Sequence, residues 1–129
     1  MNTLVSFLEP GEEAELDLVK EAELCRTNGI EFYSFPIADR GVPASRDKTL
    51  NLLRELEHRL TAGKTVGIHC RQGIGRSAVI AACLLIATGE TADTAFERIS
   101  HVRGLPVPET AEQREWVNSL APQISAVRH

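Results

Sequence analysis

Cys70 and Arg76 have the types and the spacing needed to act on a negatively charged group. They stand between an extended run, Thr65–Ile68, and a long apolar segment, so the sequence predicts a strand, a tight loop and a helix. The first N–H groups of a helix lack intrahelical partners and carry the positive end of the dipole, so they converge on an anion in the loop. Gly73 and Gly75 allow the loop to turn. We therefore expect the thiol of Cys70 to ionise readily. We also expect Arg76 to donate hydrogen bonds to two oxygens of a phosphate.

The same stretch matches a known signature at five positions, His69, Cys70, Gly73, Arg76 and Ser77, and has a second glycine at Gly75. In this pattern it resembles the His-Cys-x-x-Gly-x-x-Arg-Ser/Thr loop of the cysteine-dependent dual-specificity and tyrosine phosphatases. Two other glycine motifs do not fit. The segment that ends in Gly63-Lys64-Thr65 precedes a strand, whereas a nucleotide-binding loop follows one, and Ala78 stands where a dinucleotide fingerprint has its third glycine.

The resemblance implies a two-step phosphatase mechanism. Cys70 would attack phosphorus, and Ser77 would ease departure of the thiolate from the phosphocysteine. His69 would support the loop and not act as a base. The residues that would bind the phosphate are Arg71, Gln72, Gly73, Ile74, Gly75 and Arg76. No metal or other cofactor is expected, because Arg76 and the loop amides supply the positive charge that a cation would otherwise provide.

A carboxylic acid must protonate the leaving oxygen, and Asp39 and Asp47 are the upstream candidates. Asp47 follows Ser45-Arg46 at a predicted helix start, where a carboxylate already complements the helix dipole. Asp39 stands in the turn after a predicted strand, and Phe35 to Asp39 resembles the acid loop of the family. We therefore assign the general acid to Asp39, with turn formation as its structural alternative.

Gln113 has two interpretations. The segment from Glu109 to Gln113 resembles the loop in which tyrosine phosphatases carry a glutamine that positions the hydrolytic water. Thr110 and Gln113 also fit a capping box, with threonine at the N-cap and glutamine three residues later, and a capping box requires no catalytic role. Both interpretations stay open on the sequence.

Composition limits the setting in which this chain acts. It has 129 residues, a net charge of -4 and three cysteines without paired spacing. This charge disfavours nucleic acid and anionic membranes as partners, and unpaired cysteines favour a reducing compartment. The apolar run from Ala78 to Ala87 is shorter than the ~20 residues that span a bilayer. We expect a monomeric cytoplasmic protein whose partner is a phosphorylated protein or peptide.

Strand and helix signals alternate, which predicts an α/β fold with a central, largely parallel sheet and helices on both faces. The predicted strands are Leu4–Leu8, Ile30–Pro36 and Thr65–His69. The predicted helices are Glu12–Thr27, Arg46–Thr61, Gly75–Thr88, Ala92–Val102 and Ala111–Leu120. We expect a single domain over residues 1–120, followed by a tail over residues 121–129. Members of the resembled family have a further strand and helix upstream of the segment matching Leu4, so the chain is either a compact variant or truncated at its start.

Three other functions compete with a protein phosphatase. A rhodanese-like sulfurtransferase uses a similar cysteine loop, but His69 and the pair Arg76-Ser77 favour phosphate. A pseudophosphatase that only binds phosphoproteins would be expected to lack the cysteine, the arginine or the acid. A phosphoinositide or RNA-end phosphatase is the main alternative, although its loops carry extra lysines, or Thr-Gly after the arginine, where this chain has Ser77-Ala78. A shallow site for phosphotyrosine, and also for phosphoserine or phosphothreonine, is expected because the chain has no tyrosine-bearing recognition loop.

Overall fold

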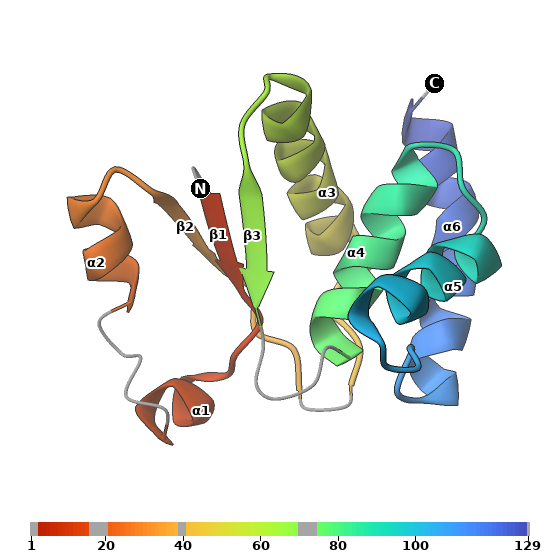
Figure 1. Ribbon diagram of the computed structural model, residues 1–129, viewed down its shortest axis with the longest axis horizontal. Helices are drawn as coiled ribbons and strands as arrows, with labels where there is room; N and C mark the ends of the chain where they lie inside the picture. Colours follow the sequence, from red (N-terminus) through yellow and green to blue (C-terminus); the bar gives the residue numbers. More distant parts are fainter. Residues whose placement is uncertain (1–2, 16–20, 39–40, 70–74, 129) are drawn as a thin grey trace.

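Three short parallel strands form the sheet at the centre of the fold (Figure 1). The computed structural model describes residues 3–15, 21–38, 41–69 and 75–128. The strands are β1 (Thr3–Ser6), β2 (Glu31–Ser34) and β3 (Val66–His69). β1 lies in the middle and pairs with both neighbours, so that Val5 stands opposite Tyr33 and Ile68. The side chain of Val5 is fully buried.

Helices cover both faces of this sheet, as predicted. α1 (Pro10–Glu15) and α2 (Glu21–Thr27) connect β1 to β2, and α3 (Arg46–Thr61) connects β2 to β3. Because connections between parallel strands are right-handed and β2 and β3 flank β1 on opposite sides, the two connections lie on opposite faces. Figure 1 shows α1 and α2 on one side of the sheet and the remaining helices on the other.

α4 (Gly75–Ala87) is the helix around which the helices on its own side of the sheet pack. It contacts α3, α5 (Ala92–Arg103) and α6 (Ala111–Arg128). Its side chains are buried from Gly75 through Ile80, as expected for a helix that is apolar nearly all round. Close packing on several sides holds its N-terminus in a fixed place. In the described part of the chain, no helix has both the length and the apolar character to cross a membrane.

The bounds predicted for α3 are confirmed. Ser45 caps α3 by accepting a hydrogen bond from Lys48 N. Leu60 is 47% exposed, because the contacts of α3 with the core end at Leu56. Arg59 is half-buried: its guanidinium binds both carboxylate oxygens of Glu31 and lies over the ring of a β2 tyrosine.

Two helix boundaries also require correction. α1 begins at Pro10, earlier than predicted, because proline suits the first helical position, where an N–H has no partner. The described part of the predicted helix Glu12–Thr27 contains α1 and α2, on either side of residues 16–20, which lie outside the described residues. The predicted end of the last helix at Leu120 is wrong. α6 continues through Pro122 to Arg128, and Ile124 is buried in the core, which offsets the cost of an internal proline.

Candidate active site

The candidate site lies where the carboxyl ends of the three parallel strands meet. In open parallel sheets, ligands bind in the crevice outside these ends. The segment after β1 leads into α1, the segment after β2 carries Ile37, and the segment after β3 leads into α4. Figure 1 shows α1 and the start of α4 at this same end of the sheet. The topology therefore brings three segments together that are distant in the sequence.

Arg76 is held at this edge by residues from the other two segments. Its Nη1 and Nη2 atoms donate to the two carboxylate oxygens of Glu12, at 2.6 and 2.8 Å, and Nη1 also donates to the carbonyl oxygen of Ile37 at 3.0 Å. The side chains of Arg76 and Glu12 are 2% and 12% exposed. A buried, bidentate ion pair of this kind fixes the plane of the guanidinium.

These contacts determine which N–H donors of the Arg76 guanidinium can bind other groups. The Glu12 carboxylate accepts hydrogen bonds from the edge formed by Nη1 and Nη2. The Ile37 carbonyl oxygen accepts from the second N–H of Nη1. The guanidinium has five N–H donors in a fixed fork. The edge formed by Nε and the remaining N–H of Nη2 is the one that Glu12 and Ile37 do not use. That edge has the parallel geometry that binds two oxygens of a phosphate.

Glu12 was not among the residues singled out from the sequence, where it appeared only as part of a helix in an acidic region. One signal could have revealed it. Glu12 follows the strand that pairs directly with the strand preceding Arg76, and residues after neighbouring parallel strands meet at one edge. Its 64-residue separation from Arg76 hides that relation in a linear sequence.

Several predicted site residues fall outside the described part of the chain. These are Asp39, Cys70, Arg71, Gln72, Gly73 and Ile74, together with the side chain of His69. The described members are Gly75 and Arg76, which begin α4, Ser77, which is 9% exposed beside them, and Gln113 in α6. The roles assigned to all of these residues stay predictions.

Of the described residues that flank Asp39, Ile37 is anchored to Arg76. Ile37 N donates to Phe7 O at 3.0 Å, and the Ile37 carbonyl accepts from Arg76. Gly41 N donates to Ala38 O at 2.7 Å. The segment that carries Asp39 is thus tied at its base to the arginine of the candidate site.

Gln113 forms the predicted capping box and makes a further contact that the sequence did not indicate. Its backbone N–H donates to Thr110 Oγ1 at 3.1 Å, and its Oε1 accepts from Thr110 N at 3.3 Å and from Glu109 N at 3.0 Å. Its Nε2 donates to the carbonyl oxygen of Gly41 at 3.0 Å. The side chain is fully buried. Gln113 therefore joins the start of α6 to the segment that follows Asp39, and its proposed role in positioning water stays a prediction.

Glu109 brings a second carboxylate to the start of α4. Its carboxyl group occupies the space that a Cβ atom on Gly75 would need, so any side chain at position 75 would displace it. The residue itself is exposed. In the sequence, Glu109 marks only the start of the segment that resembles the glutamine loop, and nothing there indicates its contact with Gly75.

The two cysteines described by the structure are poorly suited to act as nucleophiles. Burial raises the pKa of the Cys83 thiol to about 12, and that side chain is fully buried. Desolvation, with a smaller contribution from the Glu21 carboxylate, raises the pKa of Cys25. Both side chains lie in the interior. A raised pKa disfavours the thiolate, which is the reactive form.

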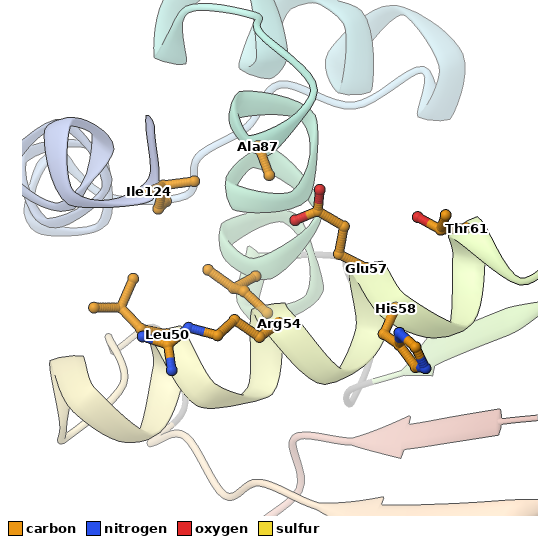
Figure 2. Close-up of a pocket in the computed structure, with 8 residues that line it drawn as sticks. Leu50, Arg54, Glu57, His58, Thr61, Ala87 and Ile124 are labelled. Carbon is orange, nitrogen blue, oxygen red and sulfur yellow. The ribbon is translucent and has the colours of Figure 1, made fainter. Parts of the chain in front are cut away.

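A separate pocket lies far from the residues of the candidate site. It has a volume of about 310 Å³ and is lined mainly by α3 residues, among them Arg54 and His58, with Ala87 and Ile124 closing it from α4 and α6 (Figure 2). Ala87 is the last residue of α4 and Gly75 the first, so the helical rise separates them by roughly 18 Å. The pocket is therefore not part of the candidate site.

Comparisons with known proteins show which sequences and folds this chain resembles. A family model described as "Polymorphic toxin system, DSP-PTPase phosphatase" matches residues 2–90. The mouse protein tyrosine phosphatase domain-containing protein 1 is 33% identical over 134 residues, an alignment that covers 95% of this chain and 18% of the mouse protein. This chain thus spans less than a fifth of the length of that relative.

Two solved structures have the same fold. Tk-PTP in its active form has a TM-score of 0.82 and 30% identity, with 95% of this chain and 79% of that chain covered. PTPMT1, solved in complex with PI(5)P, has a TM-score of 0.87 and 21% identity, with 100% of this chain and 81% of that chain covered. The likeness to PTPMT1 is evidence for the fold alone.

Proposed function

Because this chain belongs to the family of dual-specificity and tyrosine phosphatases, we propose that it hydrolyses phosphomonoesters on proteins through a covalent phosphocysteine. The observation that carries this proposal is the ion pair between Glu12 and Arg76. It fixes the guanidinium of a buried arginine at the first turn of α4, six residues after Cys70, which supports a role for Arg76 in binding phosphate.

In the first step, the thiolate of Cys70 forms a bond to phosphorus while the bond from phosphorus to the leaving oxygen breaks. Asp39 donates its proton to that oxygen. Arg76 and the amides at the start of α4 bind the nonbridging oxygens, where negative charge must be stabilised during transfer. The contact between Arg76 and the Ile37 carbonyl supports this assignment, because it ties the segment bearing the acid to the residue that binds the phosphate.

In the second step, water forms a bond to phosphorus and the bond from phosphorus to sulfur breaks. Asp39, now ionised, accepts the proton from water, and Ser77 donates a hydrogen bond to the departing thiolate. Inorganic phosphate and the free enzyme result. Gln113 contributes by holding the segment after Asp39 through Gly41, and the family resemblance adds a role in positioning the water.

The proposed substrates are phosphotyrosine and, in addition, phosphoserine and phosphothreonine in proteins. Tyr33, the only tyrosine in the chain, lies in β2 beneath Arg59 and so does not stand in a loop that could deepen the site. We propose that the protein acts as a monomer on phosphoproteins in the cytoplasm. The PI(5)P bound in the PTPMT1 structure makes a lipid headgroup the second candidate.

One substrate panel tests the proposal. The protein is incubated with each substrate in the presence of a metal chelator. The substrates are peptides bearing phosphotyrosine, phosphoserine or phosphothreonine, vesicles containing phosphoinositides, and an RNA with a terminal phosphate. We expect phosphate release from the phosphotyrosine peptide at the highest kcat/KM. Release from the lipid or the RNA alone would contradict the proposal.

Arg76→Lys is expected to lower kcat/KM on a phosphotyrosine peptide about 10²- to 10³-fold, the usual cost of removing a fixed donor to a developing oxyanion. Lysine retains the charge but cannot bind Glu12 and two phosphate oxygens at once. Near-normal kcat/KM in this variant would contradict the role given to the arginine.

Glu12→Gln tests whether the ion pair positions Arg76. It should lower kcat/KM roughly 10- to 100-fold, because small displacements of a catalytic group are costly. The matched control is Glu23→Gln, which removes an exposed carboxylate of α2. Vanadate affinity and thermal unfolding are measured in parallel. A loss of stability with unchanged kcat/KM would show that Glu12 is only structural.

A further inference from the structure

Gly41 closes the segment that carries the proposed general acid. Its N–H donates to the carbonyl oxygen of Ala38 at 2.7 Å, so residues 38 and 41 are joined across the two residues between them. A Cβ atom at position 41 would lie 2.9 Å from that same oxygen and 3.2 Å from the Cβ atom of Ala38. A side chain there would have to displace the backbone of residue 38, which explains why this position holds glycine.

The carbonyl oxygen of Gly41 is held by the buried side chain of Gln113. Nε2 of Gln113 donates to it at 3.0 Å, while Oε1 accepts from the backbone N–H groups of Glu109 and Thr110. A carbonyl oxygen can only accept and a backbone N–H can only donate, so these partners fix the orientation of the amide. Gly41 is thus bound on both sides, by Ala38 through its N–H and by Gln113 through its carbonyl.

The same contacts leave Gln113 poorly suited to orient the hydrolytic water. A water that attacks phosphorus keeps a lone pair for the new bond and donates its hydrogens, so an orienting amide must offer it an oxygen. Oε1 of Gln113 has two lone pairs, and both are taken by backbone N–H groups. The side chain is also fully buried. The amide therefore has no acceptor left for a water molecule.

Building on the proposed phosphatase function, we propose that Gly41 and Gln113 form a clamp that positions the segment bearing Asp39. Gln113 is then a positioning residue for the first chemical step, in which the general acid protonates the leaving oxygen, and it does not act on the water of the second step. The clamp joins this segment to the start of α6, whereas the Ile37 carbonyl joins it to Arg76. Fixing both ends of the segment limits how far the acid can move from a productive position.

Two substitutions break the clamp in different ways. Gln113→Glu retains an oxygen for the two backbone N–H groups and loses only the donor to Gly41, while Gly41→Ala introduces the collision with Ala38. Each should lower kcat/KM about 10- to 100-fold on phenyl phosphate and about three-fold or less on an activated aryl ester, because a displaced general acid matters most for poor leaving groups. Thr110→Ala is the matched control. It removes the hydrogen bond from Gln113 N, leaves the bond to Gly41, and should not change the dependence on leaving-group pKa.

A double-mutant cycle with Asp39→Asn identifies the step. If the clamp acts through the acid, Gln113→Glu lowers kcat/KM no further once Asp39 has been replaced. A residue that orients water would behave differently: kcat would fall, kcat/KM would not, and the phosphocysteine would accumulate with a burst of released alcohol. That pattern, or an equal loss of kcat/KM for all leaving groups, would overturn the clamp.

Hydrogen exchange tests the clamp without turnover. The amide of Gly41, which donates to Ala38 O, should exchange about two- to ten-fold faster in Gln113→Glu than in the wild-type protein, the range that one hydrogen bond contributes. Thr110→Ala should leave that rate unchanged. An unchanged rate in Gln113→Glu would overturn the clamp. Faster exchange in a protein that releases no phosphate from any substrate would count against the phosphatase function alone.

Discussion

Cys70→Ser is expected to abolish phosphate release while the phosphopeptide still binds. The alcohol of serine ionises far less readily than a thiol, so the variant lacks a nucleophile at neutral pH. In a serine protease that forms a covalent intermediate, removal of the nucleophile lowers kcat by about 10⁶-fold. Binding should survive because Arg76 is held by Glu12 and Ile37, which the substitution does not touch.

Two measurements check this expectation. Phosphate release is followed with a phosphotyrosine peptide at saturating concentration, and binding of the same peptide is followed by calorimetry. Cys25→Ser is the matched control, because Cys25 is buried in α2 and its pKa is raised by desolvation. Substantial turnover by Cys70→Ser would rule out the thiolate mechanism, and full activity loss in the control would show that the assay reports folding.

Asp39→Asn is expected to lower the rate on phenyl or alkyl phosphates by roughly 10²- to 10⁴-fold, the usual range for lost general acid catalysis. An amide cannot give up a proton to the leaving oxygen. Poor leaving groups depend on that proton most, so activated esters should lose much less. The segment on either side of Asp39 is anchored by Arg76 at Ile37 and by Gln113 at Gly41, which holds its base at the site.

Asp47→Asn provides the comparison, because Asp47 lies in the first turn of α3, where its charge complements the helix dipole. This variant should change the rate little. Both variants are assayed with aryl phosphates of graded leaving-group pKa. If Asp47→Asn steepens the dependence on leaving-group pKa and Asp39→Asn does not, the general acid has been assigned to the wrong aspartate.

The elements of the fold could be predicted where local chemistry determines them. Ser45 and Thr91 have the side chains that cap a helix, and both cap one in the structure. The apolar segment after Gly75 could only be a buried helix, and the run before His69 could only be a strand beside it. Such features depend on neighbours in the sequence, so the α/β architecture followed from them.

The parts that escaped prediction depend on contacts between distant segments. The pairing of Glu12 with Arg76 requires knowledge of which strands are adjacent, and periodicity does not supply it. The contact of the Glu109 carboxyl group with Gly75 joins residues 34 positions apart, so local patterns do not indicate it. The end of α6 was misplaced because Pro122 suggests a stop, whereas burial of Ile124 favours continuation.

The length of α6 has a consequence for how far this chain can be shortened. Its last turns pack Leu120 and Ile124 into the same core as α4, the helix whose first turn carries Arg76. A recombinant fragment trimmed at residue 120 would leave part of that core open to water. α4 would then lose part of its packing against α6. An inactive fragment of this kind would reveal nothing about the chemistry of the intact protein.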